Sequence, residues 1–203
     1  MDEIVYILIN EAMPGYVKIG ITDDLNRRIM ELSRTSVPVP FECFFAKKVK
    51  DSRDIEKKMH ATFAKDRVDS GAGREFFMIP PEQAAAALSM VDGEDIIQHD
   101  DSINTEQEKI ALAEVRSRRP VFNFTNVGIT SGSTLNFYLD ESITCTVFDA
   151  RKVKFNEDVV SLSDAAMQVL KTKGLNWKAV SGPGIWMFEG ETLDDRRKRM
   201  EQE

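Results

Sequence analysis

Residues that build disulfide or metal-bound frameworks are scarce in this sequence. Its 203 residues include two cysteines, Cys43 and Cys145, and two histidines, His60 and His99. Two cysteines so far apart exclude a disulfide framework, and these four residues exclude a zinc site built within one segment. No apolar run reaches the roughly 18 to 20 residues that span a bilayer. The start, Met1-Asp2-Glu3, lacks the basic region of a secretory signal, so we expect a cytoplasmic protein with no membrane partner.

Negative charge is concentrated in one short stretch. The chain has 27 Lys and Arg against 34 Asp and Glu, a net charge of -7. Residues 91–117 hold eight of the acidic and two of the basic side chains, and the flanking segments are close to neutral. A neutral domain can still present a local basic face, so the acidity does not exclude a nucleic-acid partner. We predict two domains, residues 1–90 and 118–203, joined by an acidic, partly helical linker over residues 91–117.

Hydrophobic patterning in residues 1–90 predicts an α+β domain, a small antiparallel sheet flanked by helices. The β-branched run Ile4–Ile9 predicts a buried strand, and Pro14-Gly15 turns the chain into a second strand over residues 16–20. The other expected elements are strands over residues 41–49 and 74–78 and helices that begin near residues 22, 51 and 80, the first of them capped by Thr22.

Four separate motifs follow one another in this segment. They are V-Y-x-L at residues 5–8, K-I-G-x-T at residues 18–22 with Leu25 and Arg28, E-x-x-x-H at Glu56 and His60, and R-E-F-F at residues 74–77. Their order and spacing over residues 4–88 resemble the GIY-YIG nucleases, specifically a phage and bacterial subgroup. The resemblance implies the GIY-YIG fold and a metal-dependent DNA endonuclease that hydrolyses phosphodiester bonds.

The resemblance also implies a role for each matching residue. Tyr6 matches a tyrosine proposed to activate the attacking water, but Lys18 stands where most members have a second tyrosine, so either residue is a candidate general base. Arg28 matches the arginine that holds the scissile phosphate, and Glu75 matches the carboxylate that binds Mg²⁺ or Mn²⁺. A histidine that many members carry one turn beyond Arg28 is absent here, and His60 is its candidate substitute.

These residue types suit phosphodiester hydrolysis, which needs an activated water, a clamp on the phosphate oxygens and a Lewis acid. One carboxylate suffices for Mg²⁺ because that ion keeps several of its waters. A tyrosine, with an ordinary pKa of about 10, needs a neighbouring cation to act as a base near pH 7. Four further basic residues are predicted to contact phosphates without sequence preference: Arg27, Arg34, Lys47 and Lys48.

Residues 118–203 have the pattern of a second small, β-rich α+β domain. The motifs are G-S-x-L at residues 132–135, S-L-S-x-A-A at residues 161–166 and G-P-G-x-W-x-F-x-G at residues 182–190. They resemble the restriction-enzyme-adenine-methylase-associated domain, which implies recognition of DNA, including modified DNA, in restriction, antiviral defence or phage biology. Trp186 is the candidate DNA contact, although a place in the core is the commoner role of a tryptophan in a small β-rich domain.

Two alternatives to an active nuclease stay open. The acidic charge, the missing histidine and the lack of an identifiable late family asparagine favour a DNA-binding or adaptor protein that keeps the scaffold without turnover. The joint presence of Tyr6, Lys18, Arg28 and Glu75 disfavours it. A weaker alternative is an inhibitor whose acidic linker mimics DNA. If the protein is a nuclease with one site per chain, double-strand cutting requires a homodimer or two visits.

Overall fold

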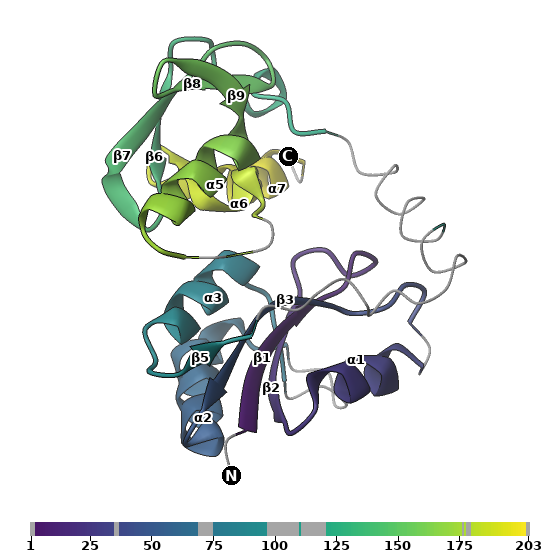
Figure 1. Ribbon diagram of the computed structural model, residues 1–203. Helices are drawn as coiled ribbons and strands as arrows, with labels where there is room; N and C mark the ends of the chain where they lie inside the picture. Colours follow the sequence, from purple (N-terminus) through teal and green to yellow (C-terminus); the bar gives the residue numbers. More distant parts are fainter. Residues whose placement is uncertain are drawn as a thin grey trace. The chain divides into compact units, whose positions relative to one another are not determined.

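The chain divides into two compact units, Met1–Pro120 and Val121–Glu203. The computed structural model describes residues 3–34, 37–68, 75–96, 110, 121–175, 177 and 180–201. Both units combine an antiparallel sheet with helices, which confirms the predicted α+β class (Figure 1). Within these described ranges, no helix has the length and apolar character needed to cross a membrane.

The first unit is built on a five-stranded antiparallel sheet in the order β4-β2-β1-β3-β5. Its strands are β1 (Glu3–Ile9), β2 (Val17–Thr22), β3 (Glu42–Val49), β4 (Phe76–Phe77) and β5 (Glu94–Asp95). Strand β1 lies at the centre because its continuous apolar run can be buried on both faces of the sheet. The predicted strands of this segment are therefore present, and β5 is additional.

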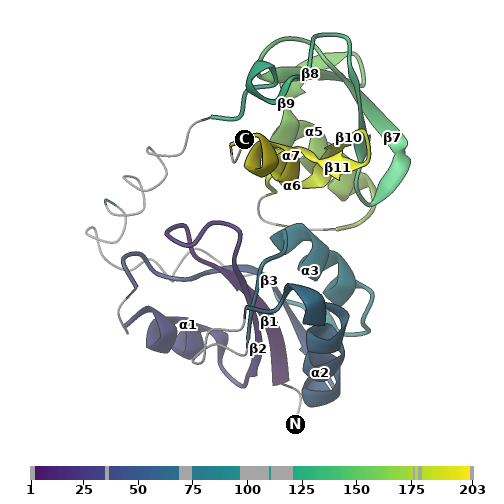
Figure 2. The same cartoon turned by 180° about the vertical axis from the view of Figure 1, so that it is seen from behind.

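Helices cover both faces of this sheet (Figures 1 and 2). Helix α1 (Leu25–Ser33) lies on one face, and α2 (Ser52–Thr62) and α3 (Pro81–Ser89) lie on the other, with a single 3-10 turn, η1 (Ala64–Asp66), after α2. The predicted cap of α1, Thr22, is wrong by two residues. The Asp24 carboxylate accepts the backbone N–H of Arg27 at 3.0 Å, while the Thr22 hydroxyl accepts the N–H of Asp24 at 3.1 Å.

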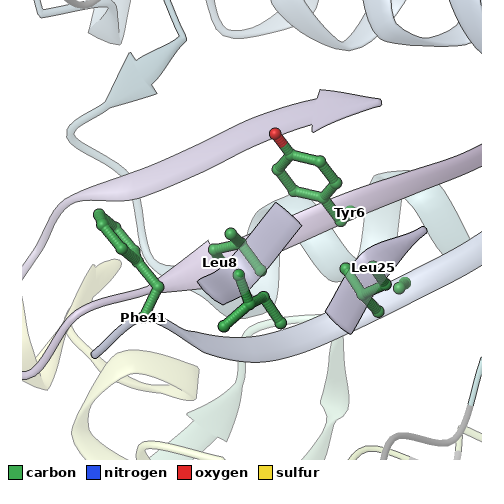
Figure 3. Close-up of a cluster of buried hydrophobic side chains, with 6 residues drawn as sticks. Tyr6, Leu8, Leu25 and Phe41 are labelled. Atoms are coloured by element: carbon green, nitrogen blue, oxygen red, sulfur yellow. The ribbon is translucent and has the colours of Figure 1, made fainter. Parts of the chain in front are cut away.

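The strand register determines which side chains share a face. Tyr6 lies directly opposite Gly20 of β2 and Ala46 of β3, and Leu8 lies opposite Lys18. Residues opposite one another in antiparallel strands point to the same side of the sheet. The side towards α1 therefore carries a buried cluster around Tyr6, shown in Figure 3, whose members are Tyr6, Leu8, Leu25, Ile29, Phe41 and Ala46.

The sheet of the first unit continues past residue 90, where the first domain was predicted to end. Strand β5 pairs with β3, and Asp95 Oδ1 lies 3.3 Å from Lys47 Nζ. This cross-strand ion pair gives an acidic segment a partner in the sheet, which its composition alone did not indicate. The remainder of the predicted linker, residues 97–117 apart from Ile110, lies outside the described residues.

The second unit has a six-stranded antiparallel sheet in the order β11-β10-β6-β7-β8-β9. Its strands are β6 (Thr134–Phe137), β7 (Asp140–Val147), β8 (Lys152–Phe155), β9 (Asp158–Ser161), β10 (Trp186–Phe188) and β11 (Glu191–Thr192). The helices are α5 (Leu162–Thr172), α6 (Gly182–Ile185) and α7 (Leu193–Glu201), with a 3-10 turn, η2 (Thr125–Val127), near the start.

Trp186 lies in the core of the second unit. Its side chain is 0% exposed, and its ring centroid lies 5.1 Å from that of Phe137 and 6.1 Å from that of Phe155. Its Nε1–H donates to the carbonyl of Leu162 at 3.0 Å, which joins β10 to the start of α5. This burial corrects the prediction of Trp186 as a DNA contact, because the indole presents no surface to a ligand.

Replacing Trp186 tests this structural role. Trp186→Phe keeps an aromatic ring but loses the buried hydrogen bond to the Leu162 carbonyl and part of the packing of the larger indole, so we expect the free energy of unfolding to fall by about 1–3 kcal/mol. Urea denaturation followed by circular dichroism measures the change. DNA affinity should be unaltered under native conditions, and a variant of unchanged stability with weakened DNA binding would contradict the core assignment.

Candidate active site

Tyr6 is held in place by the close approach of β1 to β2. Its side chain is 1% exposed, and a Cβ atom placed on Gly20 would lie 2.5 Å from Tyr6 Oη and 2.8 Å from Cζ. Only glycine leaves room for the phenol ring at this position. In Figure 3 the hydroxyl oxygen points away from the labelled aliphatic side chains. The ring is thus fixed by the core, and its polar end is directed out of it.

Arg28 of α1 meets that hydroxyl. Its Nε–H donates to Tyr6 Oη at 3.3 Å, and its Nη1 lies 3.6 Å from Glu31 Oε2. The Arg28 side chain is 35% exposed, so the rest of the guanidinium can still reach a ligand. Tyr6 and Arg28, two predicted site residues that are 22 positions apart in the sequence, are therefore in contact.

Burial and the surrounding charges set the protonation state of Tyr6. Burial raises the pKa of the Tyr6 phenol above its ordinary value of 10.0, and the hydrogen bond from Arg28 only partly opposes this. The negative charges of Glu75 and Glu56 raise the pKa further. Tyr6 is thus a neutral phenol near pH 7, and its own O–H is available to donate.

Lys18 and Glu75 form an ion pair at the edge of the sheet. The Lys18 side chain is 6% exposed, whereas that of Glu75 is 40% exposed. The pair forms because β4 lies against β2, and the backbone N–H of Ile19 donates to the carbonyl of Glu75 at 3.0 Å. Lys18 Nζ also lies 5.1 Å from the ring centroid of Phe76. A buried ammonium needs such partners, and here they come from the R-E-F-F motif. The first residue of that motif, Arg74, lies outside the described residues.

Helix α2 brings His60 to the same strand. His60 Nε2 lies 3.1 Å from the carbonyl oxygen of Ile19, and the imidazole ring centroid lies 5.0 Å from that of Phe77. This contact joins α2 to β2 at the residue between Lys18 and Gly20. His60 therefore lies next to the polar side chains of Tyr6, Lys18, Arg28 and Glu75, which are called the cluster from here on. One of its ring nitrogens is engaged by the backbone.

Glu56, one turn before His60, joins the cluster as well. Burial raises the pKa of its carboxyl group, and the negative charge of Glu75 adds to that rise, while His60 and Lys18 oppose it. The sequence contained a signal for Glu56 in the E-x-x-x-H motif, but a surface pair with His60 is the commoner interpretation of that spacing. Its partial burial beside Glu75 and Lys18 adds it to the candidate residues.

The structure places the four predicted phosphate contacts in different surroundings. Arg27 pairs with two carboxylates of its own helix region, those of Asp23 and Glu31. Lys47 is buried on the face opposite Tyr6, where its Nζ lies 3.3 Å from the Ser89 carbonyl and pairs with Asp95, so its predicted DNA contact is corrected to a structural role. Lys48 and Arg34 are exposed.

The carboxylates of the cluster limit which metal it can hold. In the part of the chain that the structure describes, no group of three or more His, Cys, Asp and Glu gathers around one point. The available donors are Glu75 and Glu56, two carboxylates near enough for the charge of Glu75 to raise the pKa of Glu56, and a divalent cation would relieve this repulsion. One or two carboxylate ligands suit Mg²⁺ or Mn²⁺, which complete their shells with water, and do not suit a closed zinc site.

Residues 3–92 match the family of the T5orf172 domain. The match supports a nuclease-related domain in the first unit and contains every residue of the cluster just described. Neither the curated proteins nor the solved structures contain a match to this chain.

The contact between Gly20 and Tyr6 can be tested by paired substitutions. In Gly20→Ala the new methyl group overlaps the phenol, so we expect about 1–3 kcal/mol of destabilisation and displacement of the hydroxyl from Arg28. Tyr6→Phe removes the oxygen that lies nearest to the added methyl group. Chemical denaturation of the two single variants and the double variant should show that Gly20→Ala costs less in the Tyr6→Phe background. Strictly additive effects would contradict the described packing.

Proposed function

We propose that the first unit is a DNA endonuclease of the GIY-YIG type that hydrolyses phosphodiester bonds with the help of bound Mg²⁺ or Mn²⁺. The observation that supports this most is the convergence of the separate motifs. Tyr6 of β1 binds Arg28 of α1, and Lys18 of the neighbouring strand β2 pairs with Glu75, which precedes β4. Glu56 and His60 of α2 are drawn to the same strand β2. A structural role alone does not require so many partly buried polar groups to gather.

Arg28 and Tyr6 would bind the phosphate. The guanidinium can grip two non-bridging oxygens at once, and its Nε–H bond to Tyr6 Oη fixes its orientation before the substrate arrives. Because Tyr6 accepts from Arg28, its own O–H is available to donate to a phosphate oxygen or to the attacking water. The raised pKa of the phenol favours this donor role over that of a general base.

Glu75 and Glu56 would hold the cation, which when bound supplies a Lewis acid and lowers the pKa of a coordinated water. Lys18 pairs with Glu75 and thereby keeps that carboxylate at the edge of β2, facing the position of the phosphate. Its ammonium also adds positive charge where the pentavalent transition state accumulates negative charge. His60 would hold α2, and with it Glu56, against β2.

We also propose that the second unit contributes to DNA recognition, including that of modified DNA, in restriction, antiviral defence or phage biology. The support for this is the resemblance of its three motifs to the restriction-enzyme-adenine-methylase-associated domain. Trp186 is not part of that recognition surface, because it is buried. Arg196 of α7 lies over the Phe188 ring and is held by the Val127 carbonyl and by Glu189 and Glu191.

Cleavage of DNA tests the nuclease directly. Supercoiled plasmid and phage genomic DNA, modified and unmodified, are incubated with the protein and Mg²⁺ or Mn²⁺. We expect metal-dependent nicking that falls by at least about 100-fold in Glu75→Gln and by about 10- to 100-fold in Arg28→Lys, which keeps the charge but loses the two-pronged grip. Asp66→Asn, at an exposed carboxylate of the same unit, serves as the matched control and should cleave normally.

The outcome of this assay also separates the alternatives. DNA binding without cleavage by the wild-type protein, on all four substrates and with either metal, would contradict the nuclease and favour the catalytically inactive binding protein.

Glu56 gives a test based on pH. Burial raises the pKa of the Glu56 carboxyl group in the folded protein, so folding disfavours the charged form. The stability that the protonated Glu56 contributes is therefore fully present below its pKa in the unfolded chain and is lost as the pH rises through its pKa in the folded protein. Glu56→Gln should therefore be more stable than the wild type at pH 7 in EDTA. It should also lose cleavage and the rise in melting temperature that Mg²⁺ produces in the wild type. A destabilised variant that still cleaves would contradict the assignment.

A further inference from the structure

Two exposed basic side chains of α2 lie beside the Glu56–His60 face of that helix. Arg53 precedes Glu56 by three residues and Lys57 precedes His60 by three, so each cation neighbours one of these residues on the helix surface. Met59, on the other side of α2, is buried against the sheet. Arg53 and Lys57 are both exposed, and among the described residues neither forms an ion pair.

The third cation of this helix is in a different situation. Lys58 Nζ lies 2.6 Å from Asp54 Oδ2, four residues earlier, and this pair lies further around the helix from Glu56. The carboxylate of Asp54 thus pairs with Lys58, whereas Arg53 and Lys57 form no ion pair with any residue that the structure describes. In α1, by contrast, Arg27 is paired with Asp23 and Glu31. Among the described residues, α2 thus carries two exposed cations without an ion pair beside Glu56 and His60.

We propose that Arg53 and Lys57 bind successive phosphates of the DNA strand that enters the candidate active site across α2. This inference rests on the proposed nuclease function and names the surface by which the first unit holds its substrate. The two residues are four positions apart, about 6 Å along the helix axis, which lets them hold neighbouring phosphates of one strand. Such contacts fix the position of the backbone without reading its sequence.

Glu56 and His60 then lie between this basic pair and the sheet. A phosphate backbone held by Arg53 and Lys57 would reach Glu56 and His60 first and, past them, Glu75 at the β4 edge of the sheet. The two cations also offset the repulsion between a DNA strand and the Glu56 carboxylate, because they lie beside the helix face that carries Glu56 and His60.

The helix supplies its own matched control. The full chain is titrated with a fluorescent DNA duplex in EDTA, where no cleavage occurs, at several salt concentrations. Lys57→Ala and Arg53→Ala should each weaken binding by about 3- to 10-fold at low salt and lower the slope of log affinity against log salt by about one. Lys58→Ala removes the same charge from the same helix and should change affinity less than about 2-fold. Alanine suits a helix, so none of these changes threatens folding.

Cleavage assays on the same variants separate this inference from the proposed function. Lys57→Ala should raise KM and leave kcat near that of the wild type, because the lost contact holds the substrate at a distance from the reacting phosphate. Equal losses of binding in Lys57→Ala and Lys58→Ala would overturn the inference, as would unchanged binding in Lys57→Ala and Arg53→Ala while the wild type cleaves DNA. A wild type that neither binds nor cleaves DNA would refute both the inference and the proposed function.

Discussion

The packing of the Tyr6 ring against Gly20 determines the geometry on which the candidate site depends. It requires that β1 and β2 pair in one register, because a shift by a single residue would replace glycine with a side chain that overlaps the phenol. The same register places Lys18 opposite Leu8, on the α1 side of the sheet. Arg28 can then reach the hydroxyl from α1, and β4 can bring Glu75 to Lys18.

Around this packed centre the first unit keeps charged groups where burial disfavours them. Glu56 has a raised pKa because of burial and because of Glu75, and Lys18 is almost fully enclosed. Apolar residues at these positions would give a more stable sheet edge. Their retention together, at one end of two neighbouring strands, is typical of sites where stability is sacrificed for chemistry or binding.

Much of the fold follows from local patterns in the sequence. The apolar run in β1 predicted its strand because burial on both faces of a sheet leaves a local pattern in the sequence. Strand β9 has a weaker local signal, because its hairpin turns through Asn156 and Glu157, both with positive φ, rather than through the usual Asn-Gly pair. Strand β5 was missed because its stability comes from Lys47, 48 residues away in the chain.

The spacing of the motifs in the sequence predicted the main residues of the candidate site but not the surroundings of each side chain. Ordered motifs brought Tyr6, Lys18, Arg28 and Glu75 together, but the fate of a single basic or aromatic side chain depends on its tertiary neighbours. Lys47 and Trp186 were predicted from the sequence to contact DNA at the surface. In the structure, elements distant along the chain bury both side chains. Glu56 resembles a surface residue and is drawn into the cluster by the docking of α2 on β2.

Binding of a cation by Glu56 and Glu75 in a nuclease site can be measured with Mn²⁺ as a paramagnetic probe. Nuclear magnetic resonance spectra of the full chain are recorded as Mn²⁺ is added, and DNA cleavage is measured at the same concentrations. We expect selective broadening of the amide signals near residues 18–20, 56–60 and 75–77, with cleavage that rises over the same Mn²⁺ range. Broadening confined to the acidic residues beyond Val91, or none in the cluster while DNA is cleaved, would contradict it.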